Sequence, residues 1–296
     1  MTLGCHEAVS QGEASAPAPL APELARALEE VLADGSLELP LLPGVASELL
    51  GLSADAATDA PRLAALLHRD PALAANVLRV ANSPAYLPRV PIVSLQQAIT
   101  RLGFRNLRDI AVASCLQAGV FRAPGREAQV RAIWRHSLAS AAFGREIARS
   151  LRRNVESAFL CGLLHEVGKP LVLQTLLRLA AERGATPDDD ALEAALDAYH
   201  VRAGILLAER WSLPSAVARA IAEYRLEGRE GEPAAESAIV ALADLLATHL
   251  LAPDRISAEE LVAHPSRDLL NLYPEDLDRI LEHRDRVEAL ADSMTT

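Results

Sequence analysis

Apolar residues recur every three or four positions in one segment after another along this chain, the spacing that places them on one face of an α-helix. The short stretch Val90-Pro91-Ile92-Val93 is the only one that looks extended, and proline favours a connector there. We therefore expect an all-α protein. The predicted helices are 22–34, 43–52, 60–68, 71–82, 94–102, 105–118, 129–151, 155–166, 170–183, 189–210, 214–226, 234–251, 257–262 and 274–291.

Several of these helices carry recognisable end signals. Asp70-Pro71 and Leu213-Pro214 place proline in a first turn, where its missing N–H costs no hydrogen bond. Asn82-Ser83 predicts a helix end whose polar side chains bond to neighbouring backbone. The acidic run 188–190 predicts a solvated helix start, because carboxylates complement the positive end of the helix dipole.

The helices are expected to form a bundle in two lobes. Residues 1–21 are rich in Ala, Pro, Ser and Gly, which predicts a disordered tail. Residues 22–123 are predicted to form an N-terminal helical lobe, and 124–232 a second lobe that the helices of 233–296 complete. The segment 122–126 has the composition of a turn, and the cleft between the lobes is the natural place for a ligand.

Composition and charge narrow the class of protein. Only 3% of the 296 residues are aromatic, whereas Ala and Leu are abundant, which excludes an all-β fold. The formal net charge of -11 argues against non-specific binding of nucleic acid or of an anionic membrane. The longest apolar stretch, 238–251, contains Asp244 and His249 and is shorter than the roughly 20 residues that span a bilayer. Three cysteines without CxxC spacing, and no leader pattern, favour a reducing cytoplasm without membrane insertion.

Positive charge is concentrated in one part of the chain. Residues 62–153 contain 15 arginines and four acidic residues, a local charge of +11, so the rest of the chain carries -22. These arginines can pair with acids of the C-terminal half, or they can bind an anionic partner. The densest group is Arg145, Arg149, Arg152 and Arg153, of which the first three share one helical face. We take this group as the candidate binding surface for an acidic ligand or protein.

A set of histidines and carboxylates could hold a metal ion. The candidates are His136, the adjacent pair His165-Glu166, and Asp244, each within a predicted helix. Imidazole and carboxylate ligands suit Mn, Fe, Zn or Mg. The adjacent pair can reach one site only where its helix ends, which Gly168 indicates. The alternative is that these histidines are ordinary core or surface residues.

Several motifs in register give the chain a resemblance to the HDOD domain family. The likeness covers about residues 37–226. The motifs that carry it are Leu39-Pro40-Leu-Leu-Pro43-Gly44, Asp70-Pro71-Ala-Leu73, Ala81-Asn82-Ser83, Ala98-Ile99-Thr-Arg-Leu102-Gly103, Trp134-Arg-His136, Gly162-Leu-Leu-His165-Glu166-Val-Gly168-Lys169, Tyr199-His200-Val-Arg-Ala-Gly204 and Trp211-Ser-Leu213-Pro214.

The resemblance implies an all-α domain related to the HD phosphohydrolases, with an HD-like C-terminal lobe, in bacterial proteins of signalling or regulation. The HD superfamily binds metal through a histidine, a His-Asp pair and a distal Asp, which correspond to His136, His165 with Glu166, and Asp244. Glu166 replaces an aspartate and moves its oxygens by roughly an ångström, which weakens the expected site.

Relatives that cleave cyclic dinucleotides have further histidines and a Gly-Tyr-Pro motif. His200 stands at the first extra position, but Glu223-Tyr224 occupies the place of a His-His pair, and no Gly-Tyr-Pro occurs. A two-metal phosphodiesterase site therefore looks broken. Lys169, the only lysine of the chain, stands where HD hydrolases place a lysine beside the phosphate.

Two functions of different classes follow. The first is a catalytically degenerate regulatory module that needs no cofactor and binds a partner protein or a nucleotide, with the arginine group and His200 as candidate contacts. The alternative is a metal-dependent phosphohydrolase acting on a nucleotide or cyclic dinucleotide, in which Lys169 stabilises phosphate charge. A nucleic-acid partner is disfavoured by the net charge, and a homodimer is left open.

Overall fold

The computed structural model describes residues 20–34, 36–52, 56–118, 121, 123–226 and 233–295. These residues form α-helices and connecting loops, with no strand among them, which confirms the all-α prediction. The helices are α1 (Pro22–Asp34), α2 (Gly44–Leu50), α3 (Ala56–His68), α4 (Pro71–Ala81), α5 (Leu95–Leu102), α6 (Phe104–Gln117), α7 (Glu127–Ser150), α8 (Val155–Leu164), α9 (Gly168–Arg183), α10 (Asp189–Arg210), α11 (Ser215–Glu223), α12 (Ala235–Leu251), α13 (Ala258–Ala263), α14 (Pro265–Leu269), α15 (Pro274–Leu281) and α16 (Arg284–Thr295).

The predicted helices match these elements closely except near the C-terminus. The predicted helix 274–291 is wrong as a single element, because a turn at residues 282–283 divides it into α15 and α16. The five-residue α14 was not predicted, since it is too short to show a helical period.

Side-chain caps account for several of the helix ends. The carboxylate of Asp70 accepts a hydrogen bond from the Leu73 N–H, and that of Asp188 accepts one from Ala191. After α4, the Asn82 amide bonds both the N–H and the carbonyl of Ile92, each at 2.8 Å. This confirms the structural role predicted for Asn82, which ties the end of α4 to the loop before α5. The same prediction is wrong for Ser83, whose buried Oγ has no hydrogen bond with the described residues.

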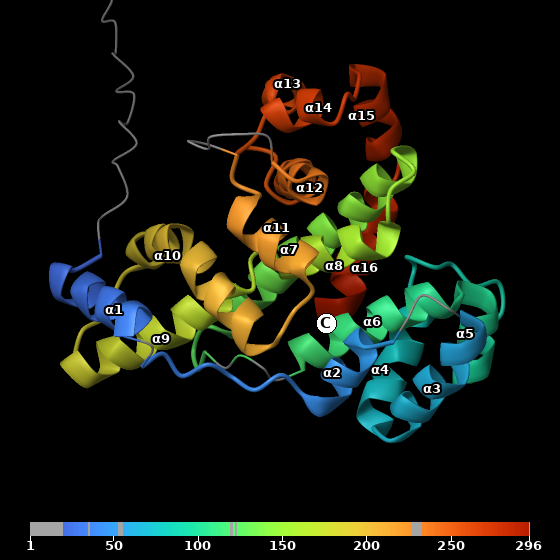
Figure 1. Ribbon diagram of the computed structural model, residues 1–296, viewed down its shortest axis with the longest axis horizontal. Helices are drawn as coiled ribbons and strands as arrows, with labels where there is room; N and C mark the ends of the chain where they lie inside the picture. Colours follow the sequence, from blue (N-terminus) through green and yellow to red (C-terminus); the bar gives the residue numbers. More distant parts are fainter. Residues whose placement is uncertain are drawn as a thin grey trace, which may run out of the picture.

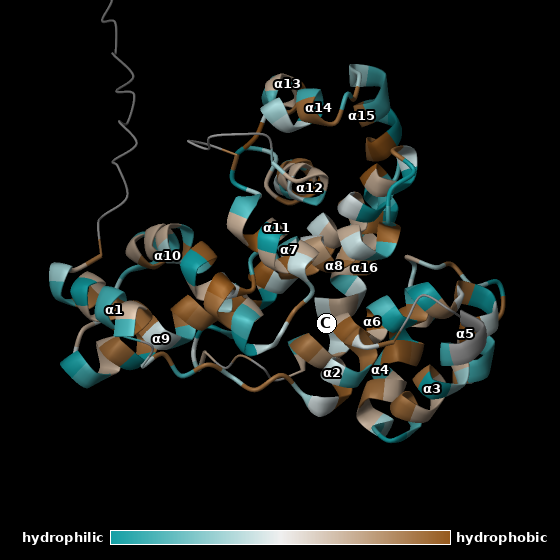
Figure 2. Cartoon of the chain, viewed as in Figure 1, coloured by the Kyte–Doolittle hydropathy of each residue, from teal (hydrophilic) through white to brown (hydrophobic). Residues whose placement is uncertain are grey.

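The 24-residue helix α7 is the central element, packed against α8, α12 and α16. Figure 1 shows α2 to α6 gathered on one side of it and α9 with α10 on the other. Helix α1 lies beside α9 and α10, although the sequence grouped it with the N-terminal helices. The apolar faces turn inward along these contacts (Figure 2), and one continuous core joins them.

Close helix contacts depend on small residues. A Cβ added at Gly162 of α8 would lie 2.8 Å from the Ala141 Cα of α7, so these two backbones touch. The core also contains Trp134, Trp211 and Cys161, exposed by only 3%, 7% and 0%. The indole N–H of Trp211 donates to the Pro40 carbonyl at 2.8 Å, which joins the segment before α2 to the end of α10.

The predicted lobe boundaries remain predictions. Most of the expected tail, residues 1–19, lies outside the described residues, as does Arg122 of the expected linker. Within that linker Gly125 has a φ of +79°, a conformation that favours glycine and fits a turn before α7.

Candidate functional site

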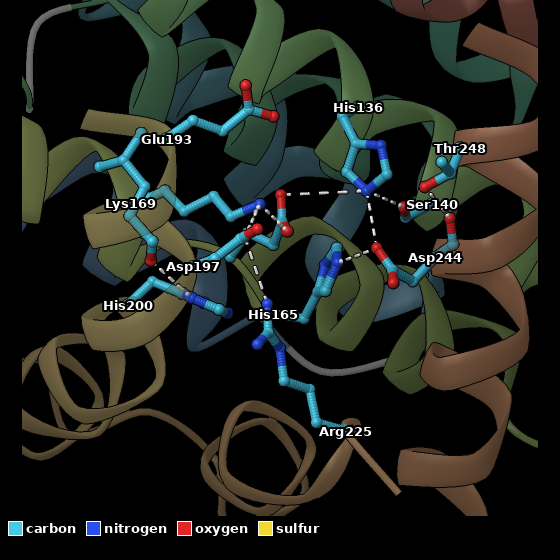
Figure 3. Close-up of polar contacts among 12 residues, drawn as sticks. His136, Ser140, His165, Lys169, Glu193, Asp197, His200, Arg225, Asp244 and Thr248 are labelled. Atoms are coloured by element: carbon cyan, nitrogen blue, oxygen red, sulfur yellow. Dashed lines mark hydrogen bonds and ion pairs between the residues drawn. The ribbon is translucent and has the colours of Figure 1, made fainter. Parts of the chain in front are cut away.

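The four candidate metal ligands come together at the centre of the molecule. His136 lies on α7 and Asp244 on α12, which pack against each other, while His165 and Glu166 follow the end of α8. One ligand atom from each of the four residues lies within 4.8 Å of all the others. Figure 3 shows His136, His165 and Asp244 pointing toward one another from these separate elements.

The adjacent pair reaches one point because the chain leaves the helix there. Helix α8 ends at Leu164 and α9 begins at Gly168, so His165 and Glu166 lie in a turn. On a continuous helix, neighbouring side chains point about 100° apart and could not share a ligand. The sequence indicated this helix end through Gly168, although the predicted helix ran to residue 166.

A carboxylate oxygen of Asp244 joins the two imidazoles. Its Oδ1 lies 2.7 Å from Nε2 of His136 and 3.2 Å from Nε2 of His165. The Nδ1–H of His165 donates to the Gly162 carbonyl at 2.7 Å, since a carbonyl oxygen can only accept. A neutral His165 then directs the lone pair of Nε2 at a carboxylate oxygen. That contact is favourable only with a proton or a cation between the two atoms.

The second carboxylate is held by the only lysine. Oε1 of Glu166 lies 2.5 Å from Nζ of Lys169, and Oε2 lies 3.9 Å from Nε2 of His136. Nζ of Lys169 is also 3.3 Å from the Asp197 carboxylate, which in turn binds Arg225 at 3.2 Å. One oxygen of Glu166 therefore faces the lysine and the other faces the ligand cluster.

Electrostatics keep the two carboxylates of the cluster ionised. Burial alone would raise the pKa of Glu166, but attraction to His136, Lys169 and His165 lowers it to about 2. Burial is likewise outweighed at Asp244, where the adjacent imidazoles of His136 and His165 hold the pKa well below its usual range. For His136, burial is opposed by the charges of Glu166 and Asp244, which raise its pKa.

The donor set and its spacing fit one divalent cation. Metal bonds to imidazole and carboxylate of about 2.1 Å place ligand atoms roughly 3.0 to 4.2 Å apart. The atoms here range from 2.7 Å between His136 and Asp244 to at most 4.8 Å, so an ion would require shifts of about half an ångström. Two imidazoles and two carboxylates suit Mn, Fe, Zn or Mg, and the longer Glu166 side chain reaches the cluster.

A cavity of about 490 Å³ opens above the cluster. Three of the four candidate ligands line it, whereas His165 is fully buried beneath. Gln129 also lines the cavity, and its buried Oε1 accepts no hydrogen bond from the described residues. The cationic groups on the wall are Lys169, Arg135, Arg225 and Arg255, and the acidic ones beyond the cluster are Glu193 and Asp197.

His200 does not contact this cavity, so its predicted role as a ligand contact is wrong. It is 0% exposed, and its two nitrogens are taken by the Leu196 carbonyl at 2.8 Å and the Tyr224 hydroxyl at 2.7 Å. Burial lowers the pKa of His200 to about 4, so the imidazole is neutral and accepts the hydrogen bond from Tyr224. The ring of Tyr224 also packs edge-on against His165, with centroids 4.8 Å apart.

The four arginines that were predicted to form a binding surface do not lie on a common surface. Arg145 is buried, donates to Asp109 and Asn106 at 3.0 Å each, and lies over the ring of Phe159, so this prediction is wrong for Arg145. Arg149, exposed at the end of α7, pairs with Glu146. Arg152 and Arg153 are exposed in the turn that follows. A role for these last three in binding remains a prediction.

Sequence reasoning missed several residues of the cavity wall. Tyr224, Arg225 and Asp197 complete the surroundings of Lys169 and His165. Asp197 stands three residues before His200 on α10, a spacing that could have placed both side chains on one helical face. In the described part of the chain, no helix combines the length and apolar character needed to cross a membrane.

A model of the HDOD domain matches residues 39–225. A curated relative, an uncharacterized protein of Treponema pallidum, is 25% identical over 170 residues, which is 54% of this chain but only 32% of that protein. The chain therefore aligns with about a third of that relative's length.

Solved structures share the fold over nearly the whole chain. An HDOD domain protein of unknown function from Geobacter sulfurreducens has a TM-score of 0.68 at 24% identity, covering 92% of this chain and 97% of its own. A Shewanella amazonensis protein named "Putative metal-dependent phosphohydrolase" has a TM-score of 0.70 at 20% identity, with coverage of 91% and 98%. At these identities the likeness establishes the fold alone.

Proposed function

This chain belongs to the HDOD domain family, and we propose that it is a regulatory binding module. It binds a nucleotide in the cavity above the four-residue cluster, with the phosphate group nearest to the cluster. The observation that carries the proposal is the convergence of His136, His165, Glu166 and Asp244 at the base of a cavity whose wall presents four cationic groups beside two acidic ones. A cluster of this composition in a concave site is the kind of arrangement that binds phosphate through a metal.

Different residues around the cluster would contact different parts of a bound nucleotide. A divalent cation held by the cluster would supply positive charge for a phosphate oxygen. The ammonium of Lys169 and the guanidinium of Arg225 lie on either side of Asp197 and can turn from it toward an anion. The unpartnered Oε1 of Gln129 suits an N–H or O–H group, such as the base or sugar of a nucleotide offers.

Binding of a nucleotide without its hydrolysis is favoured because the site lacks ligands for a second metal ion. A second metal would need further ligands, but His200 is buried behind Tyr224 and bonded to its hydroxyl. Two metal ions are what allow both the attacking and the leaving oxygen of a phosphodiester to be held at once. With only one position available, the site can hold a phosphate better than it can cleave one.

Metal content is the first test of this proposal. Elemental mass spectrometry on protein purified without an affinity metal column should give about one equivalent of a divalent metal, as expected for a single four-ligand site. His165→Ala should lose the metal, whereas His249→Ala should keep it, because His249 bonds only the Ile256 carbonyl outside the cluster. Wild-type protein without metal, or an equal loss of metal in both variants, would refute the proposal that the four-residue cluster binds a metal ion.

Nucleotide binding is the second test. Calorimetry with AMP should detect binding to the metal-loaded protein that Lys169→Met weakens by about tenfold or more, since hydrogen bonds between charged groups are the strong ones. Adenosine, which lacks the phosphate, should bind much more weakly. Equal affinity for AMP and adenosine would contradict a phosphate-directed site.

The second candidate is a single-metal phosphohydrolase, favoured by the position of Lys169 beside the cluster, with Nζ 2.5 Å from Oε1 of Glu166 at the cavity wall. Glu166→Asp restores the pair found in HD hydrolases and distinguishes the two functions. If bis(p-nitrophenyl) phosphate is hydrolysed, and faster by this variant, the chain is a hydrolase. If neither protein turns it over while both bind AMP, the binding function stands.

A further inference from the structure

A second cavity, larger than the first, lies on the opposite side of α7. It has a volume of about 670 Å³, within the range of small-molecule sites. Residues of α4, α6, α7 and α16 and of the segment between α6 and α7 surround it. It therefore lies where the N-terminal helices meet the rest of the molecule, and it shares no lining residue with the cavity above the ligand cluster.

One part of the wall is aromatic and apolar. Phe121 and Trp134 line the cavity with ring centroids 6.4 Å apart, and Val130, Ala118 and Met294 continue the surface. Flat apolar walls of this kind bury the body of an aromatic ligand.

Two arginines that form no salt bridge with the described residues line the same cavity. Arg79 bonds only neutral groups, the Asn76 amide oxygen and the Ser293 carbonyl. Arg131 donates no hydrogen bond to the described residues, and the carboxylate of Glu127, one turn earlier on the same cavity wall, attracts it through charge alone. Arg135, one turn further along α7, pairs by contrast with Glu288 and Asp292. In a chain with a net charge of -11, two such guanidinium groups at one cavity favour an anionic ligand.

A buried hydroxyl also lacks a partner at this place. Ser114 is 1% exposed and lines the cavity, and its Oγ has no hydrogen bond with the described residues. A serine inside a helix commonly bonds the carbonyl four residues earlier, as Thr175 does to Leu171 at 2.8 Å. Leaving a buried polar atom unpaired destabilises a protein, so each such atom requires an explanation. A ligand that forms a hydrogen bond with the Ser114 hydroxyl explains why this buried group has no protein partner.

We propose that this cavity is a separate binding site for a small aromatic acid, whose flat body lies against Phe121 and Trp134 and whose acidic group meets Arg131 and Arg79. Ser114 provides a hydrogen bond at the buried side of the ligand. The acidic group is a carboxylate or a phosphate, because a guanidinium pairs with both in the same geometry. This inference does not depend on the ligand cluster or on a bound metal.

Calorimetry with two pairs of probes tests the charge requirement and the source of the acid. The pairs are naphthalene-1-acetate with its uncharged amide, and AMP with adenosine. At least one acid should bind tenfold or more tightly than its uncharged partner, and Arg131→Ala should remove that preference. The exposed Arg210→Ala, outside both cavities, is the matched control and should leave it unchanged.

Two further variants separate a ligand site from a structural role. Ser114→Ala should weaken binding several-fold without lowering the thermal midpoint of the free protein, because it removes an unpaired hydroxyl. AMP binding that is lost in Lys169→Met but kept in Arg131→Ala belongs to the other cavity and does not support this site. The proposal is overturned if neither acid binds more tightly than its uncharged partner, or if Arg131→Ala and Arg210→Ala behave alike.

Discussion

Replacing Gly168 by alanine tests how the fold positions the site. Gly168 begins α9, directly after the turn that carries His165 and Glu166, and packs against the backbone of α10. A Cβ at this position would lie 1.9 Å from the His200 carbonyl oxygen and 2.6 Å from the Gly204 nitrogen. Both atoms are backbone, so no side-chain rotation can relieve the clash.

The size of the effect follows from these distances. To restore ordinary contact, α10 must withdraw from α9 by about 1.5 Å. Overpacking of a tight interior costs about 1 to 3 kcal/mol, and a clash with backbone belongs at the upper end. We expect Gly168→Ala to lower the free energy of unfolding by about 3 kcal/mol. The same movement would stretch the 3.3 Å contact between Lys169 on α9 and Asp197 on α10.

Urea unfolding followed by far-UV circular dichroism measures this loss. Gly44→Ala is the matched control, since a Cβ at Gly44 meets nothing within 4 Å and its φ is not positive. The control should stay within about 0.5 kcal/mol of wild type. If Gly168→Ala is as stable as Gly44→Ala, the two backbones are not in contact and the reasoning fails.

Three other predictions concern stability. Burial raises the pKa of Asp109 to about 6, so the folded protein binds a proton there more tightly than the unfolded chain, and stability should rise from pH 7 to pH 5. Asp109→Asn should flatten that rise in urea unfolding, and an unchanged pH profile would contradict it. Asn82→Ala removes side-chain bonds to Leu78 and Ile92 and should cost about 2 to 3 kcal/mol. Asp188→Ala removes the N-cap of α10 and should cost about 1 kcal/mol, and a loss below about 0.3 kcal/mol would argue against the cap. Thermal unfolding monitored by circular dichroism checks both substitutions, and an Asn82→Ala protein as stable as wild type would show that the loop after α4 is held by other contacts.

The local patterns predicted most helices, because a helix is stabilised by contacts within three or four residues and by its caps. Asp188 and Asn82 were assigned their roles from the residues beside them, and both roles are confirmed. The break between α15 and α16 was missed because Ile280 and Val287, seven residues apart, keep the helical phase across the five polar residues 282–286. Only packing of each helix on its own neighbours distinguishes two helices from one there.

The residues of the candidate site could be predicted from the sequence, whereas their arrangement depends on the tertiary structure. Motif resemblance identified His136, His165, Glu166 and Asp244 as possible ligands, but the 4.8 Å that encloses their donor atoms depends on how α7 packs against α12 and on the turn after α8. Helical periodicity placed Arg145 on a face with Arg149, yet it could not show that Arg145 points inward to Asp109. It also could not show that Tyr224 closes off His200.

The sequence by itself therefore determined the fold class, the family resemblance, most helix ends and the identity of the four clustered residues. The tertiary structure alone decided which side chains are buried, which charges are paired, and where two separate cavities lie on either side of α7. The reason is the separation along the sequence of the residues that interact. Helix formation depends on neighbours along the chain, whereas burial, ion pairing and cavity shape depend on residues brought together from distant segments by packing.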